Sequence, residues 1–183
     1  MSSTNDNDGS EVCNMLLPRF VTVLVGLPIL LVSIHWGGIP LFIFFTGVVF
    51  LGLREFYHMA VHGGYDAQPH VGLIAGLTLY GCMIWSGSSF TFGLETLVIP
   101  VIFTLIIMTI FIREILGFSL RHSMLKISIT FFGVFYVVWT LGHVCLLREL
   151  RPLGREYAYF LFGVIWVVDI MGYLIGKRFG RHK

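Results

Sequence analysis

Asp169 is the residue of this chain whose type and position most strongly suggest chemistry. It lies inside an apolar run that begins at Tyr157, and no other Asp, Glu, Lys or Arg lies well inside an apolar run. An ionised carboxylate costs several kcal/mol in hydrocarbon unless it is paired, hydrated or bound to a cation. We therefore expect Asp169 to face a polar cavity and to act as a metal ligand and catalytic residue. The alternative is an ion pair with a neighbouring helix.

A basic cluster follows this carboxylate. Asp169 precedes Lys177 by eight residues, which is about 12 Å along a helix axis. The cluster consists of Lys177, Arg178, Arg181 and Lys183. Such groups suit phosphates or anionic lipid headgroups at a membrane surface. Taken alone, however, the cluster is explained more simply as the positive anchor that follows many membrane spans.

Small residues share the helix face of the carboxylate. Gly172, Tyr173 and Gly176 follow Asp169 at i+3, i+4 and i+7, which are positions on one side of a helix. Gly172, Gly176 and Gly180 recur at every fourth residue, and such spacing lets a second backbone or a ligand approach closely. We therefore predict that these three glycines pack against another helix, and a homodimer is one possibility.

The elements that must position these residues are membrane helices. Hydrophobic residues make up 56% of the 183 residues and charged residues 12%, against about 25% charged in soluble domains. Four long stretches contain no Asp, Glu, Lys or Arg, namely 20–53, 67–94, 96–112 and 127–147. The sequence thus predicts an all-α, polytopic integral membrane protein with about six transmembrane helices. The net charge of +2 gives no reason to expect a nucleic-acid partner.

The predicted organisation is a polar tail followed by one membrane domain. Residues 1–15 are rich in Ser, Asn and Asp and are expected to be disordered. Residues 16–183 form the transmembrane domain. Its predicted spans are 16–34, 39–53 with a polar extension to 60, 71–85, 97–112, 127–147 and a sixth that begins at 157. Gly72 and Gly76 are expected to allow close helix packing.

The distribution of basic residues predicts the topology. With six spans, both termini share one side with nine basic residues, and the other side holds three. The nine are Arg19, Arg54, Arg113, Arg121, Lys126, Lys177, Arg178, Arg181 and Lys183. The side richer in Lys and Arg is normally cytoplasmic. We therefore expect a multi-pass protein with both termini in the cytoplasm, in the inner membrane if the cell is bacterial.

A second possible metal site follows the second span. Glu55, His58 and His62 have spacings that place them near one another on a helix, but a metal ion would need further ligands from another helix. A polar helix end at the membrane surface explains them more simply. The three cysteines, Cys13, Cys82 and Cys145, have neither metal-binding nor redox spacing.

The segment WVVDIMGYLIGKRFGRHK, residues 166–183, resembles a conserved stretch of the CDP-diacylglycerol synthases, also called phosphatidate cytidylyltransferases. That stretch reads W-x-x-D-x-x-A/G-Y-x-x-G-K/R-x-F-G-K/R-H-K. The matching positions are Trp166, Asp169, Gly172, Tyr173, Gly176, Lys177, Phe179, Gly180, His182 and Lys183. Upstream, LREFYHMA at residues 53–60 is similar to the W-E-F-Y-x-L-A segment of the family. The resemblance covers residues 16–183.

The resemblance implies a multi-span membrane enzyme of phospholipid biosynthesis. Such enzymes transfer CMP from CTP to phosphatidic acid, with Mg²⁺, and release CDP-diacylglycerol and pyrophosphate. By resemblance, Asp169 would hold Mg²⁺ or organise the polar cavity. Lys177, Arg178 and Lys183 would contact substrate phosphates.

The 183 residues do not include the motifs that follow this stretch in the family. In the family, the K-H-K end leads into an S-P-K-K-T-x-E-G motif and, further on, into the catalytic signature. We therefore expect the 183 residues to be an N-terminal portion that is inactive alone. Two other interpretations remain open. The chain could belong to an ion-coupled transporter in which Asp169 binds an ion, or it could be a non-catalytic membrane subunit in which Asp169 pairs with a partner's cation.

Overall fold

The computed structural model describes residues 24–88, 95–117 and 123–179, and these ranges contain helices and turns but no strand. The helices are Leu24–Trp36, α2 (Gly38–His62), α3 (Pro69–Ser88), α4 (Glu95–Leu116), α5 (Ser123–Gly133), the π-helix η1 (Val134–Trp139), α6 (Thr140–Glu149) and α7 (Gly154–Phe179). The predicted tail, residues 1–15, lies outside the described residues.

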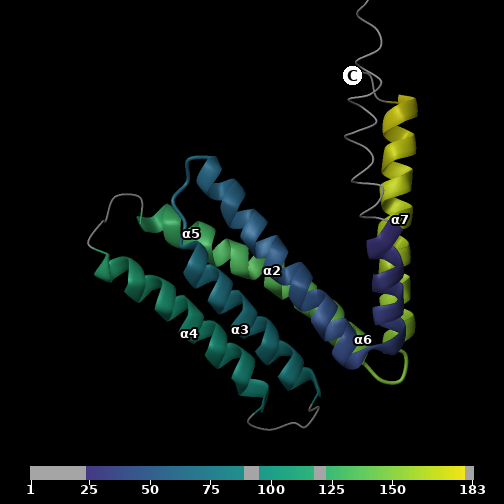
Figure 1. The fold of residues 1–183 in the computed structure, drawn as a ribbon, viewed down its shortest axis with the longest axis horizontal. Coiled ribbons are helices and arrows are strands. Elements are labelled where there is room, and N and C mark those ends of the chain that lie inside the picture. The colour runs from purple at the N-terminus through teal and green to yellow at the C-terminus, as the bar shows by residue number, and fades with distance from the viewer. Residues whose placement is uncertain (1–23, 89–94, 118–122, 180–183) are drawn as a thin grey trace, which may run out of the picture.

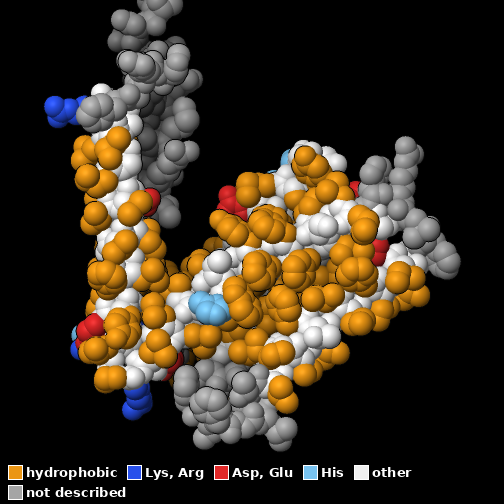
Figure 2. Space-filling view, turned by 180° about the vertical axis from the view of Figure 1, so that it is seen from behind, with side chains coloured by type: hydrophobic (Ala, Val, Ile, Leu, Met, Phe, Trp, Pro, Cys, Tyr) orange, Lys and Arg blue, Asp and Glu red, His pale blue; other side chains and the backbone are white. Residues whose placement is uncertain are grey.

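The predicted all-α membrane fold is confirmed. Four helical segments are long and apolar enough to cross a bilayer: Gly38–His62, Leu97–Leu116, Ser123–Glu149 and Gly154–Arg178. Two shorter apolar helices, Leu24–Trp36 and Pro69–Trp85, match the remaining predicted spans. Hydrophobic side chains cover most of the face shown in Figure 2, while Lys and Arg lie at the two ends of α7. A bilayer can solvate such an apolar surface.

Helices α2 to α6 form a bundle in which α3 lies at the centre (Figure 1). The buried face of α2 is a stripe of large side chains at every fourth residue, Leu41, Phe45, Val49, Leu53 and Tyr57. Small residues of α3 lie opposite this stripe. A Cβ atom at Gly72 would lie 2.0 Å from Tyr57 Oη, and one at Gly76 would lie 2.5 Å from Leu53 Cδ1. The close packing predicted for these two glycines is therefore confirmed.

Helices α5, η1 and α6 form one continuous span whose middle six residues are a π-helix. A π-helical turn inserts an extra residue and so rotates the helix face that follows it. Val134 and Val138 are both fully buried in this segment. Downstream, Gly142 packs against Met83 of α3, whose Cε atom lies 2.8 Å from a Cβ atom built at the glycine. Buried residues of this long span therefore continue through the π segment into α6.

A tight turn joins the first described helix to α2. Gly37 and Gly38 have φ angles of 65° and 53°, a conformation that side chains disfavour. Arg148, at the end of α6, holds this turn: Nε donates to the carbonyl oxygen of Ile34 at 2.7 Å, and Nη2 donates to that of His35 at 3.3 Å. Glu149 Oε1 accepts the Gly38 N–H at 3.4 Å. The end of α6 thus fixes the position of this turn.

Replacing Arg148 with Ala should lower the free energy of unfolding by about 1–3 kcal/mol, because helix-end carbonyls lose a charged hydrogen-bond donor. Thermal unfolding in detergent measures the effect. Arg151→Ala is the matched control, since Arg151 lies in the nearby connection between α6 and α7, is exposed and has no ion pair with a described residue. Equal losses in the two variants would show that Arg148 does not act through these hydrogen bonds.

Helix α7 stands away from the bundle, side by side with the helix Leu24–Trp36 (Figure 1). Tyr159 Oη donates to the carbonyl oxygen of Leu31 at 3.4 Å, and Ala158 is fully buried. In the bundle, α7 packs mainly on α6. Beyond this base, residues 167–178 are all exposed. The part of α7 that carries the predicted site is therefore open to its surroundings.

Candidate functional site

Asp169 lies on the open part of α7. Its side chain is exposed, and it forms no hydrogen bond or ion pair with a residue that the structure describes. In a membrane helix, such a carboxylate needs water, a cation or a hydrogen-bond donor. Within the described ranges no protein group fills this role.

The glycines predicted to pack lie on the same open face. No atom of the described chain comes within 4 Å of a Cβ built at Gly172 or Gly176, in contrast to the crowded Gly72 and Gly76. Tyr173 is 67% exposed. Gly180 lies outside the described residues. The structure thus shows an accessible face at Gly172 and Gly176, and the packing proposed for this face stays a prediction.

The predicted phosphate-binding residues lie at the end of α7. Lys177 and Arg178 are in its last turn, and both are exposed. Lys183 lies outside the described residues. Asp169, Lys177 and Arg178 therefore lie along about 14 Å of one helix, with Arg178 on the side opposite Asp169. Cations at a helix C-terminus also interact favourably with the helix dipole, so their position alone does not require a substrate.

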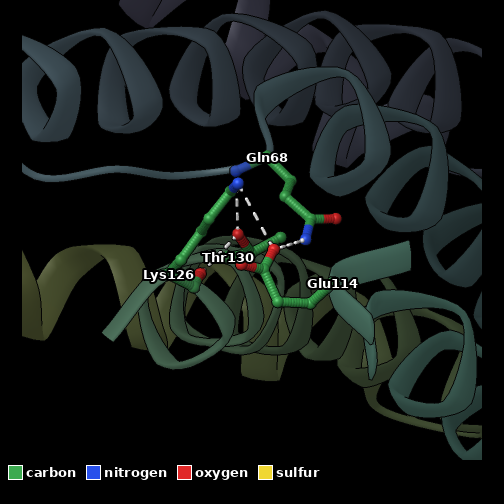
Figure 3. A network of polar contacts seen from close by, with 4 residues as sticks. All are labelled: Gln68, Glu114, Lys126 and Thr130. Atoms are coloured by element: carbon green, nitrogen blue, oxygen red, sulfur yellow. Dashed lines mark hydrogen bonds and ion pairs between the residues drawn. The ribbon is translucent and has the colours of Figure 1, made fainter. Parts of the chain in front are cut away.

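A second polar site, which the sequence analysis did not identify, lies where α3 begins and α4 ends (Figure 3). Glu114 is only 5% exposed. Its Oε2 atom accepts a hydrogen bond from Gln68 Nε2 at 2.7 Å and lies 3.3 Å from Lys126 Nζ. The Gln68 N–H donates to Thr130 Oγ1 at 3.0 Å, and Thr130 Oγ1 donates to the Lys126 carbonyl oxygen at 2.7 Å.

This network joins three helices. Glu114 belongs to α4, Lys126 and Thr130 belong to α5, and Gln68 directly precedes α3. A buried carboxylate is tolerated when a cation and hydrogen-bond donors compensate it, as they do here. A sequence signal for its burial exists: Ile106 and Ile110 are both buried, and Glu114 continues their four-residue spacing. That spacing could have predicted an inward-facing carboxylate.

The described side chains can be compared with the ligands that a metal ion needs. No group of three or more His, Cys, Asp or Glu residues close enough to hold a metal ion occurs among the described residues. The rings of His58 and His62 lie 4.0 Å apart on the exposed end of α2. Mg²⁺ commonly uses one or two carboxylates together with waters and substrate phosphates. Asp169 fits one ligand position of such a site.

A family model described as the cytidylyltransferase family matches residues 17–183. The chain belongs to the cytidylyltransferase family. This confirms the resemblance to the CDP-diacylglycerol synthases. No curated protein and no solved structure gives a significant match to the chain.

Membership of the cytidylyltransferase family indicates the kind of chemistry in which Asp169 could take part. The family is one of CTP-using transferases, and the matched range contains Asp169 and the basic residues that follow it. Four long apolar helices make this member a membrane protein. The chemistry of the cytidylyltransferase family therefore concerns a water-soluble nucleotide, while the protein that carries it lies in a bilayer.

Proposed function

We propose that the protein is a phosphatidate cytidylyltransferase, which converts CTP and phosphatidic acid into CDP-diacylglycerol and pyrophosphate. The observation that carries the proposal is the family match over residues 17–183 in a chain of apolar, membrane-length helices. A CTP-using transferase in a bilayer is well placed to act on a lipid. Phosphatidic acid presents its phosphate at the membrane surface, where a soluble nucleotide can reach it.

The reaction joins two phosphates. A phosphate oxygen of phosphatidic acid attacks the α-phosphorus of CTP, the bond to the β-phosphate oxygen breaks, and pyrophosphate leaves. Both substrates are anionic, so their charge must be offset. Mg²⁺, when bound, would supply this electrostatic compensation. In our proposal Asp169 holds the ion, while Lys177, Arg178 and Lys183 donate hydrogen bonds to phosphate oxygens and orient them.

The proposed topology places this site at the cytoplasmic surface. Successive helices alternate in direction across a membrane, so the end of α7 lies on the same side as the α2–α3 and α4–α5 connections. Arg113, Lys126, Lys177 and Arg178 are all on this side, and basic residues favour the cytoplasm. CTP is a cytoplasmic metabolite, so the basic end of α7 would face its source. In a bacterial cell this membrane would be the inner membrane.

Acceptor specificity tests the proposal. The protein expressed from its complete gene is reconstituted in phosphatidylcholine vesicles with CTP and Mg²⁺, and lipid products are identified by mass spectrometry. Vesicles containing phosphatidic acid should yield CDP-diacylglycerol, and vesicles containing diacylglycerol or a polyprenol should yield no cytidylated lipid. Ion-dependent stabilisation of the protein without any lipid product would instead support a transporter.

A further inference from the structure

A polar pocket of about 280 Å³ lies beside the Glu114 network, away from α7. Its wall comes from three places: the residues at the start of α3, the end of α4 and the beginning of α5. The lining side chains that bear on its chemistry are Gln68, His70, Arg113, Glu114 and Lys126. In the proposed topology the pocket lies on the same side of the membrane as the basic end of α7, at the depth of lipid headgroups.

Two cationic side chains supply hydrogen-bond donors to the pocket, Arg113 and Lys126. Arg113 is exposed and forms no ion pair with a described residue. Lys126 pairs with Glu114, but an ammonium group has three N–H donors. Pro69, the first residue of α3, has no N–H, but the backbone N–H groups of His70 and Val71 have no partner within the helix, and a helix N-terminus favours anions. With one carboxylate against two cations, the lining side chains have a net charge of about +1 with His70 neutral.

One buried acceptor of a residue that lines the pocket lacks a partner. Gln68 is 7% exposed, and its Oε1 atom has no hydrogen-bond partner among the described residues. The side-chain amide is fixed because Nε2 donates to Glu114, so Oε1 points away from the carboxylate (Figure 3). An unpartnered buried carbonyl oxygen costs about 1–3 kcal/mol. A ligand that offers a hydroxyl donor would relieve this cost.

We infer that this pocket binds a phosphate ester that also carries a hydroxyl group, as in a glycerophosphate headgroup. Arg113, Lys126 and the first turn of α3 hold the phosphate oxygens, and Gln68 Oε1 accepts the hydroxyl. Glu114 does not repel the ligand, because Gln68 and Lys126 already compensate its charge. The site shares no residue with the face of Asp169, so the inference does not depend on the proposed transferase reaction.

Two sources could supply this chemistry, and lipid retention separates them. The full protein is purified in detergent and incubated with phosphatidylglycerol, phosphatidylmethanol or phosphatidylcholine, and native mass spectrometry counts the retained lipids. Phosphatidylglycerol should be retained best, and phosphatidylmethanol, an anionic lipid without a headgroup hydroxyl, should be retained about tenfold less, as one lost hydrogen bond predicts. Soluble glycerol 3-phosphate that displaces the lipid would show that the headgroup alone is recognised.

Matched variants localise the binding. Arg113→Gln should weaken phosphatidylglycerol retention about tenfold, because a charged donor to the phosphate is lost. Arg54→Gln removes an exposed arginine of α2 that does not line the pocket, and it should leave retention unchanged. Equal losses of retention in both variants would show that retention depends only on the overall positive charge of the surface, and would overturn the inference. Equal retention of phosphatidylmethanol and phosphatidylglycerol would overturn the role of Gln68.

Discussion

Asp169→Asn should lower CMP transfer from CTP by about 100-fold to 1000-fold, since the substitution removes the charge that would hold a cation against substrate phosphates. Asn has nearly the same shape, and the Asp169 side chain makes no hydrogen bond with a described residue. The unfolding temperature should therefore stay within a few degrees of the wild-type value. Pyrophosphate release by the protein from its complete gene, with CTP, phosphatidic acid and Mg²⁺, measures the loss.

Two further variants make this result interpretable. Asp169→Glu keeps the charge but moves it, so it should retain more activity than Asn and require a higher Mg²⁺ concentration. Asp66→Asn removes an exposed carboxylate from the connection between α2 and α3, and it should change the rate less than about twofold. An Asp169→Asn protein that turns over normally but assembles poorly would point to the pairing role of a structural subunit.

Gly72→Ala should destabilise the fold by about 2–4 kcal/mol, from overpacking together with the loss of a buried hydrogen bond. The new Cβ atom would lie 2.0 Å from Tyr57 Oη. Tyr57 cannot easily move aside, because it is 2% exposed and its Oη donates to the Thr130 carbonyl oxygen at 2.7 Å. Chemical unfolding in detergent micelles, followed by tryptophan fluorescence, measures the change.

Gly172→Ala is the matched control for this prediction. Both glycines lie within helices of GxxxG-type spacing, but no described atom comes within 4 Å of a Cβ at Gly172. The free energy of unfolding should therefore change by less than about 1 kcal/mol, within the range of helix propensity alone. A similar loss in the two variants would mean that α7 packs, in solution, against a surface that the described chain does not provide.

Hydropathy predicted the number and type of helices well, but it predicted their ends less well. The span predicted from 127 begins at Ser123, and the one predicted from 157 begins at Gly154. Hydropathy reports which residues match the hydrocarbon core of a bilayer. Backbone hydrogen bonds continue beyond that core, so helices extend into polar sequence at the membrane surface.

Tertiary partners explain what the sequence could not reveal. The spacing of Gly72 and Gly76 predicted close helix packing from the sequence alone. The sequence did not show which residues would pack against them, and the structure identifies these as the buried stripe from Leu41 to Tyr57. The contact between Glu114 and its hydrogen-bond donor Gln68 could not be predicted, because the two residues are 46 positions apart in the chain. The π-helix also has no hydropathy signature, because it changes backbone hydrogen bonding rather than polarity.

The site itself was predicted only in part. The family resemblance seen in residues 166–183 is confirmed by the match over 17–183. The described chain places Asp169, Lys177 and Arg178 on one open helix, but it brings no further carboxylate to them. The roles given to these residues therefore rest on chemistry and resemblance, and the variants above test them.

The fate of each phosphate of CTP tests the central claim most directly. Protein from the complete gene is incubated with phosphatidic acid vesicles and CTP labelled with ³²P at either the α or the γ position. A cytidylyltransferase must place the α label in the lipid and the γ label in pyrophosphate, and Asp169→Asn must reduce both. Recovery of the γ label in lipid would identify a CTP-dependent kinase and contradict the account, as would the absence of label from lipid in both cases.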